Sequence, residues 1–288
     1  MQVDDIQTAT VLGAGTMGHG IAQVLAMCGI ETRLFDVAEA AVAKGIGAIR
    51  ANLDKGVERG KVAASDRDAA MARLSGSSDF DAAVAGSHVV IEAVPEKLAL
   101  KQDIFKKLGE RLGPDALLAS NTSSLSLSQI AAACAHPQRV VGMHFFNPVH
   151  IMKLVEVVRA EQTEPAAAEL AIALSRRMGK DPIDVRDAPG FASSRLGIAI
   201  GMEAIRMVEE QVASAEDIDK AMVLGYGFPM GPLKLTDLVG LDVRLSIAQY
   251  LEGTLGPRFA PPALLQSMVA QGKLGKKSGQ GFYDWSQG

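Results

Sequence analysis

Cysteine is scarce in this chain of 288 residues. The two that are present, Cys28 and Cys134, lie in alanine-rich apolar stretches and lack the spacing of metal ligands, which predicts reduced thiols and no metal site. No apolar run reaches the length of a membrane span, and the opening MQVDDIQ is too acidic for a secretory signal. We therefore expect a cytoplasmic protein that has no membrane partner.

Neither positive nor negative charge is in strong excess. The 29 basic residues nearly balance the 33 acidic ones, so the net charge of −4 gives no reason to expect a nucleic-acid partner. Aromatic residues make up only 5% of the chain and hydrophobic residues 48%, as in α/β enzymes rich in alanine, valine and leucine. The length predicts two domains.

Three glycines near the start form the most informative motif. In TVLGAGTMGHG a short apolar run predicts a buried strand, and Gly13, Gly15 and Gly18 follow as G-x-G-x-x-G before an apolar helical pattern. These glycines would allow a tight turn, close approach of a pyrophosphate, and close packing of helix on strand. The helix that begins near Thr16 and Met17 would direct its first N–H groups at the phosphates. A glycine turn without a ligand is the alternative, which the flanking pattern disfavours.

An acidic residue in the next strand-like run indicates which dinucleotide is bound. Asp36 closes the run ETRLFD about 20 residues after the glycines, where its carboxylate can accept both ribose hydroxyls and would repel a 2′-phosphate. No arginine or lysine occurs at 37–42. The pattern therefore predicts NAD rather than NADP as the cofactor.

Strand-like and helical runs alternate through the first 187 residues and then cease to alternate. The alternation predicts an α/β fold with a doubly wound parallel sheet of the Rossmann type. A Pro-Gly break in DAPGF marks the boundary, after which helical patterns dominate. We thus expect an NAD-binding Rossmann domain at 1–187 and an all-α domain for substrate binding and dimerisation at 188–288.

The first helical pattern of the second domain, 192–210, carries an apolar stripe wider than one domain core needs. Two interpretations remain open: the stripe forms the surface of a homodimer, or it packs within its own bundle. A capping box at Ser214 and Asp217 predicts where the next helix begins.

A candidate proton-transfer pair lies at the edge of the sheet where ligands are expected. His144 ends the strand in MHFFNP, and Glu156 follows between β-branched residues, where a carboxylate is costly to bury unless it is paired. A neighbouring imidazolium would pair with it, and the carboxylate would set the ring tautomer and raise its basicity. This predicts His144 as general base and Glu156 as its partner. A structural histidine is the alternative for His144, and His150 in the same loop is the rival base.

The polar loop NTSSLS follows another strand at the same edge. Ser123 could donate a hydrogen bond to a substrate oxygen or to the nicotinamide amide, or it could cap the next helix, as Ser126 or Ser128 could equally. Asn147 is likewise either a cofactor contact or the start of an Asx turn before Pro148.

Seven blocks together resemble one enzyme family closely. They are GAGTMGHGIAQ, ASNTSSLS, MHFFNPVHIMKLVEV, DAPGF, EDIDKAM, GFPMGPLKLTDLVGLD and GKKSGQGFYDW. In this order they resemble the short-chain L-3-hydroxyacyl-CoA dehydrogenases over nearly the whole chain, and most of all the bacterial 3-hydroxybutyryl-CoA dehydrogenases. The resemblance implies reversible NAD-dependent oxidation of an (S)-3-hydroxyacyl-CoA to the 3-ketoacyl-CoA, and therefore an acyl-CoA substrate.

The resemblance also implies roles for single positions. His144 resembles the catalytic base, Glu156 its carboxylate partner, and Ser123 the hydroxyl that contacts substrate and cofactor. Further positions resemble the family's NAD contacts, namely Asp36, Glu96, Lys101, Asn147 and Lys277. Lys55 and Arg59, four residues apart on an expected helix, match basic positions for CoA, whereas by themselves they would be taken for a solvated helix face.

One position departs from the family pattern. Four residues after the glycine of PGF the family commonly has an asparagine that holds the substrate thioester carbonyl, and this chain has Ser194. Serine keeps one donor but is shorter, so a water could bridge the gap or Ser193 could assist. The departure concerns this contact and the preferred acyl length, and it leaves the expected reaction class unchanged.

Two other functions remain open. An NAD-dependent dehydrogenase of a hydroxy acid without CoA would have no need of Lys55 and Arg59. A non-catalytic NAD-binding protein, such as the crystallin-like relatives of the family, would have no need of the pair formed by His144 and Glu156.

Overall fold

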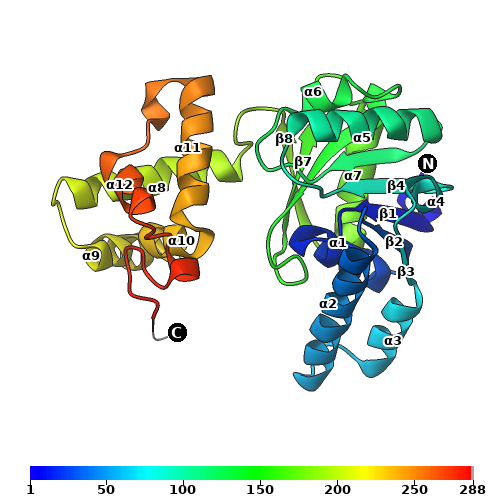
Figure 1. Cartoon of the computed structure of the whole chain (residues 1–288), viewed down its shortest axis with the longest axis horizontal. Coiled ribbons are helices and arrows are strands. Elements are labelled where there is room, and N and C mark those ends of the chain that lie inside the picture. Colours follow the sequence, from blue (N-terminus) through cyan, green and yellow to red (C-terminus); the bar gives the residue numbers. More distant parts are fainter. Residues whose placement is uncertain (287–288) are drawn as a thin grey trace. The chain divides into compact units, whose positions relative to one another are not determined.

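The computed structural model describes residues 1–286, which form two compact units separated after Ala188 (Figure 1). The first unit contains an eight-stranded sheet with helices. The second begins at Pro189, and its named elements within the described residues are all helical. The predicted fold class, a Rossmann-type sheet followed by an all-α domain, is confirmed.

The sheet has the strand order β3-β2-β1-β4-β5-β6-β7-β8. Its strands are β1 (Thr8–Leu12), β2 (Glu31–Phe35), β3 (Leu74–Ser77), β4 (Val89–Glu92), β5 (Leu117–Ser120), β6 (Val140–Phe145), β7 (Leu154–Arg159) and β8 (Asp181–Arg186). The strands from β3 to β6 in this order run parallel. The chain order reverses between β1 and β4, and dinucleotides bind at the carboxyl ends of strands beside such a switch point.

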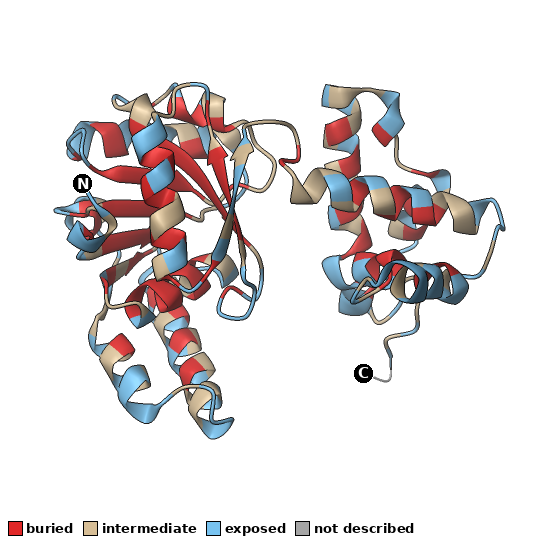
Figure 2. Ribbon diagram, turned by 180° about the vertical axis from the view of Figure 1, so that it is seen from behind, coloured by how far each residue is buried: buried red, intermediate tan, exposed pale blue. Residues whose placement is uncertain are grey.

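Helices cover this sheet. They are α1 (Thr16–Met27), α2 (Glu39–Glu58), α3 (Ala64–Ala72), α4 (Phe80–Val84), α5 (Leu98–Arg111), α6 (Leu127–Ala131) and α7 (Pro165–Arg177). The central strands are buried on both faces, and Figure 2 shows them as continuous red arrows. This is why their sequences are continuous apolar runs instead of alternating ones.

The last two strands differ from the predicted all-parallel sheet. Strand β7 runs antiparallel to β6, and β8 runs parallel to β7. The connection between β6 and β7 consists of residues 146–153 and contains no helix. A parallel crossover needs a dozen or more residues, so this short loop can only return the chain in the opposite direction.

The second unit is built around α8 (Ser193–Glu209). The other helices are α9 (Ala215–Lys220), α10 (Pro232–Val239), α11 (Leu241–Leu255) and α12 (Ala263–Ala270). Ser214 caps α9, as predicted, by accepting a hydrogen bond from Asp217 N at 3.1 Å. None of the helices in residues 1–286 has both the length and the apolar character needed to cross a membrane.

A buried carboxylate fastens the C-terminal segment to α10. Asp237 is fully buried, and its carboxylate accepts hydrogen bonds from Phe282 N and Tyr283 N, both at 2.9 Å, and from Trp285 Nε1 at 2.8 Å. Gly281 lies against the same carboxylate, because a Cβ there would come within 2.1 Å of Asp237 Oδ1. The Asp237 side chain therefore fastens the C-terminal segment to the helical unit.

We expect Asp237→Ala to lower the free energy of unfolding of the helical unit by about 2–4 kcal/mol, because it leaves several buried donors without an acceptor. Asp284→Ala is the matched control, since its carboxylate is exposed and its hydrogen-bond partner among the described residues is the neighbouring Ser286. Urea unfolding followed by Trp285 fluorescence measures both. Equal stability of the two variants would contradict the anchoring role of Asp237.

Candidate active site

The glycine-rich turn joins β1 to α1. Gly13 has a φ of 101°, and a Cβ at Gly18 would lie 1.6 Å from the Gly13 carbonyl oxygen, so both positions require glycine. A Cβ at Gly15 would meet no atom within 4 Å, which leaves the space beside this backbone open. Gly15 is also the N-cap of α1 and offers no side-chain acceptor to the N–H groups of Thr16 and Met17. These features fit a bound pyrophosphate.

Asp36 follows β2 directly, and two backbone donors fix its carboxylate beside this turn. Its Oδ2 accepts from Ala14 N at 2.9 Å, and its Oδ1 accepts from Ala38 N at 3.3 Å. The side chain stays partly exposed. A carboxylate held at the carboxyl end of β2 is suitably placed for the ribose hydroxyls of NAD, and the contact itself remains a prediction.

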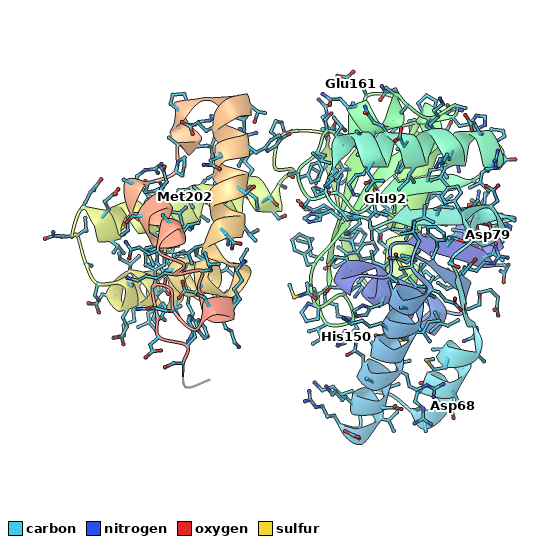
Figure 3. All side chains as sticks on the ribbon, in the orientation of Figure 1. Asp68, Asp79, Glu92, His150, Glu161 and Met202 are labelled. Atoms are coloured by element: carbon cyan, nitrogen blue, oxygen red, sulfur yellow. The ribbon has the colours of Figure 1, made fainter. Side chains whose placement is uncertain are left out.

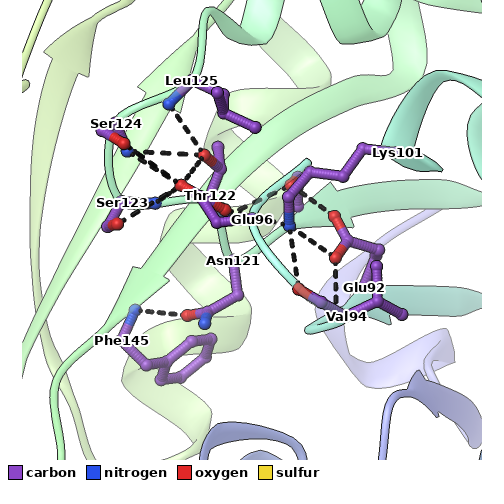
Figure 4. Close-up of polar contacts among 11 residues, drawn as sticks. Glu92, Val94, Glu96, Lys101, Asn121, Thr122, Ser123, Ser124, Leu125 and Phe145 are labelled. Carbon is purple, nitrogen blue, oxygen red and sulfur yellow. Dashed lines mark hydrogen bonds and ion pairs between the residues drawn. The ribbon is translucent and has the colours of Figure 1, made fainter. Parts of the chain in front are cut away.

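A buried ion pair lies at the carboxyl end of β4 (Figure 4). Lys101 Nζ, from α5, is 2.7 Å from Glu92 Oε1, and the two side chains are 1% and 0% exposed. The same carboxylate accepts hydrogen bonds from Val94 N and from Ser120 Oγ, both at 2.7 Å. Because either charge alone would be very costly to bury, the pair holds β4, β5 and α5 in one arrangement.

The Lys101 ammonium also connects this pair to the loop after β5. Its Nζ lies 3.2 Å from Glu96 Oε2, while Glu96 Oε1 accepts from Thr122 Oγ1 at 2.6 Å and from Ser123 N at 2.9 Å. Burial alone would raise the pKa of Glu96, but the Lys101 ammonium and the hydrogen bonds from the loop outweigh it and hold the pKa below its usual value. Glu96 is therefore an ionised anchor for the loop that carries Ser123.

The structure excludes some of the alternative roles predicted for the polar side chains of these loops. Ser126 is the N-cap of α6 and accepts from Gln129 N at 3.4 Å, so Ser123 is not the helix cap. Asn121 Oδ1 accepts from Phe145 N at 2.9 Å and joins this loop to β6. Asn147 is exposed, and its side chain makes no hydrogen bond within residues 1–286, so it forms no Asx turn there; its contact with the cofactor remains a prediction.

Strands β6 and β7 pair so that His144 and Glu156 stand directly opposite each other. His144 Nδ1 is 2.7 Å from Glu156 Oε2, the carboxylate is 0% exposed and the histidine 7%. The ring of Phe146 lies against the imidazole, with 4.5 Å between the ring centroids. When Nδ1–H donates to the carboxylate, Nε2 is the ring nitrogen that can exchange a proton with a substrate.

The rival base, His150, lies in the loop after β6 (Figure 3). It forms no ion pair within the described part of the chain, and its pKa is lowered by burial and by the nearby charges of Lys180 and His19. Lys180 is buried and donates to the carbonyl oxygens of Val149 and, at 2.9 Å, Met152, which fixes this loop. Since no carboxylate orients the His150 ring, His144 is the better candidate for the base.

Lys55 and Arg59 are exposed, yet they line a pocket of about 360 Å³ instead of a flat helix face. Lys55 lies in the last turn of α2 and Arg59 is its C-cap residue, while α1 supplies Gln23 and the loop after β6 contributes His150. Lys61 adds a third cation to the lining. Several cations around one concave surface can bind the phosphate groups of a nucleotide such as CoA.

Two predicted site residues belong to the helical unit. Ser194 lies in the first turn of α8, is partly buried, and its hydroxyl makes no hydrogen bond within residues 1–286. Lys277 pairs with Asp242, with Nζ 2.6 Å from Oδ2. The roles of both in binding substrate or cofactor remain predictions.

Sequence reasoning missed Glu92, Thr122 and Lys180. Glu92 carried a usable signal, because it is a carboxylate inside the apolar run HVVIEA, just as Glu156 lies inside an apolar run. Thr122 and Lys180 gave no comparable signal, because their partners come from distant loops.

Comparison with known proteins shows which family the chain belongs to. The domain model described as "3-hydroxyacyl-CoA dehydrogenase, NAD binding domain" matches residues 8–188, and "3-hydroxyacyl-CoA dehydrogenase, C-terminal domain" matches residues 190–285. The chain is 46% identical to a 3-hydroxybutyryl-CoA dehydrogenase of Mycobacterium tuberculosis, over 98% of this chain and 99% of the relative. It is 44% identical to a probable 3-hydroxybutyryl-CoA dehydrogenase of Bacillus subtilis, with the same coverage of 98% and 99%.

A solved structure of a relative has the same fold. The (S)-3-hydroxybutyryl-CoA dehydrogenase of Ralstonia eutropha superposes with a TM-score of 0.94 at 40% identity, over 98% of this chain and 100% of that one. The family's first domain binds NAD, which agrees with the cofactor that Asp36 and the glycines predict. The protein belongs to the 3-hydroxyacyl-CoA dehydrogenase family.

Proposed function

We propose that the protein catalyses the reversible, NAD-dependent oxidation of (S)-3-hydroxyacyl-CoA esters to 3-ketoacyl-CoA esters in the cytoplasm, with short acyl chains such as 3-hydroxybutyryl. The observation that carries the proposal is the contact of 2.7 Å between His144 Nδ1 and Glu156 Oε2 at the carboxyl end of β6. The glycine-rich turn and Asp36 at the same edge of the sheet support the cofactor, and family membership supports the substrate class.

In this mechanism three side chains have separate roles. His144 Nε2 removes the proton of the 3-hydroxyl group, and Glu156 stabilises the imidazolium that forms. Both the backbone N–H and the hydroxyl of Ser123 donate to Glu96 Oε1, at 2.9 Å and 3.3 Å, and the hydroxyl would turn to donate a hydrogen bond to the substrate oxygen. The glycine-rich turn and Asp36 would hold NAD⁺, which would supply the acceptor for the hydride that leaves carbon 3 of the substrate.

His144→Gln tests the base. Glutamine keeps a polar group beside Glu156 but cannot take up a proton, so we expect kcat for acetoacetyl-CoA reduction to fall roughly 100- to 10,000-fold, with unchanged affinity for NADH. Absorbance of NADH measures turnover, and fluorescence titration measures binding.

His150→Gln is the matched control in the neighbouring loop, and it should keep the kcat of the wild type. Near-normal turnover of His144→Gln, or loss of kcat in His150→Gln, would show that the base has been assigned wrongly. If the wild type does not oxidise NADH with acetoacetyl-CoA, the proposed function itself is wrong.

Replacing both Lys55 and Arg59 by alanine tests the CoA site. Because charge-assisted hydrogen bonds to phosphate would be lost, we expect KM for acetoacetyl-CoA to rise about 10- to 100-fold, while NADH affinity stays the same. An acetoacetyl thioester without the CoA nucleotide should show no such change. Arg176→Ala, an exposed cation on α7, is the control. A KM that rises equally for both thioesters would argue against a CoA site here and for a substrate without CoA.

We also propose that the protein is a homodimer through the helical unit. The unit exposes large apolar side chains, among them Leu196, Leu224 and Tyr226, which are 63%, 81% and 78% exposed. An apolar groove of about 380 Å³ runs along α8 and includes Ile200 and Met207. Apolar surface of this kind commonly marks a protein interface.

Leu224→Glu should therefore shift the protein from dimer to monomer, as measured by sedimentation velocity. Val37→Glu, at an equally exposed apolar position of the sheet unit, should leave the dimer intact. A monomeric wild type, or a dimer in both variants at all concentrations, would speak against this surface.

A further inference from the structure

A buried lysine holds the loop that connects β6 to β7. Lys180 lies between α7 and β8, is 8% exposed, and forms no ion pair within residues 1–286. Its Nζ donates to the carbonyl oxygens of Val149 and, at 2.9 Å, Met152. Buried charges in proteins are normally paired, because removing a charge from water is costly. Here two carbonyl dipoles take the place of a carboxylate.

The main chain on both sides of Lys180 fixes where its side chain can reach. The backbone N–H of Lys180 donates to Ser175 O at 3.0 Å, at the C-terminal end of α7. The backbone N–H of the next residue, Asp181, donates to Lys153 O at 2.8 Å, where the loop ends. Main-chain hydrogen bonds therefore already hold Lys180 beside the loop.

The two carbonyl oxygens that Lys180 reaches belong to one turn of the chain. The backbone N–H groups of Ile151 and Met152 both donate to Pro148 O, at 3.0 and 2.9 Å. The later carbonyls of this turn, at Val149 and Met152, receive no other hydrogen bond from the described residues. Lysine side chains commonly satisfy the carbonyls at the end of a helical turn in this way. Without Lys180 both oxygens would lose their donor.

The turn held by Lys180 forms one wall of the pocket at the end of α2. Its carbonyl contacts lie on either side of His150 and Ile151, and both of these residues line the pocket that contains Lys55 and Arg59. Figure 3 shows His150 beside α1 and α2. Burial of the ring and, next, the charge of Lys180 lower the pKa of His150, so the field of the ammonium reaches the pocket. One side chain thus supports the wall of the pocket and adds positive charge behind it.

The opposite side of the same turn rests on α1. Val149 is buried, and a Cβ at Gly20 would come within 2.9 Å of the Val149 Cβ. This contact is made by the valine side chain and not by its carbonyl, so it does not depend on Lys180. Asn147, the predicted cofactor contact, precedes the turn. The effect of Lys180 is therefore expected at the pocket wall and not at the cofactor.

We propose that Lys180 is a positioning residue for the nucleotide of CoA, because it holds the pocket wall at 150–151 and so sets the affinity for this part of the substrate. The proposal rests on the proposed function, under which the pocket beside Lys55 and Arg59 takes the CoA phosphates. Phosphates bound there would also partly offset the charge of Lys180. The chemistry at His144 does not depend on Lys180, because pairing with β7 fixes that side chain.

Lys180→Met tests this role. Methionine fills a similar volume but offers no donor, so we expect KM for acetoacetyl-CoA to rise about 5- to 20-fold, with kcat and NADH affinity within about twofold of the wild type. An acetoacetyl thioester that lacks the CoA nucleotide should show no such rise. Lys180→Arg keeps both the charge and the donors and should restore most of the affinity.

Lys153→Met is the matched control at the end of the same loop. Lys153 is exposed, and its Nζ donates to Gly179 O at 3.3 Å. Its replacement should leave KM for both thioesters unchanged. An equal rise of KM for acetoacetyl-CoA in Lys153→Met and Lys180→Met would overturn the specific role of Lys180.

Hydrogen exchange followed by mass spectrometry separates a local effect from a loss of stability. Lys180→Met should speed exchange in the peptide that contains Ile151 and Met152 and leave exchange in β4 and β5 unchanged. Faster exchange throughout the sheet unit, together with a loss of kcat, would show that Lys180 only stabilises the fold and would overturn the proposal.

Failure of this proposal and failure of the proposed function give different results. If the wild type reduces acetoacetyl-CoA and Lys180→Met keeps its KM, or raises KM equally for both thioesters, the positioning role is wrong and the dehydrogenase stands. If the wild type does not reduce acetoacetyl-CoA, calorimetry with free CoA decides. Weaker binding to Lys180→Met than to the wild type then supports the role of Lys180, and equal binding or none overturns it.

Discussion

The arrangement of the sheet unit depends on a pair of charges that water does not reach. Glu92 and Lys101 neutralise each other in the interior, and neither side chain could stay there without the other. Since Glu92 ends β4 and Lys101 comes from the following helix, the pair fixes the strand, the helix and the turn between them. Lys101 then reaches Glu96, which holds the backbone of the Ser123 loop. The loop that carries Ser123, the proposed hydrogen-bond donor to the substrate, is thereby tied to the centre of the sheet.

The antiparallel direction of β7 likewise fixes the candidate base, His144, in place. In an antiparallel pair, residues that stand opposite each other have neighbouring side chains on the same face. His144 and Glu156 are such a pair, so the contact follows from strand register and not from loop conformation. A slip of one residue would move one of the two side chains to the other face of the sheet.

Much of the fold and of the candidate site could be predicted from the sequence, and there are physical reasons why the rest could not. The glycine turn, Asp36, His144 and Glu156 were found because each combines an unusual residue type with an apolar strand. The direction of β7 was missed, because an extended run looks the same in either direction and only the short connection at 146–153 reveals it. Lys55 and Arg59 were recognisable as a candidate binding site only through resemblance, because the pocket that they line also needs a loop distant in sequence.

Asp237 has a consequence for how the chain reaches its final structure during synthesis. Its carboxylate is buried in α10, but its donors belong to residues 282–285. While residues 1–281 emerge from the ribosome, the helical unit contains an acceptor whose partners do not yet exist. The sheet unit, by contrast, has both members of its buried ion pair by residue 101. Synthesis therefore completes the cofactor-binding half well before the helical half can close.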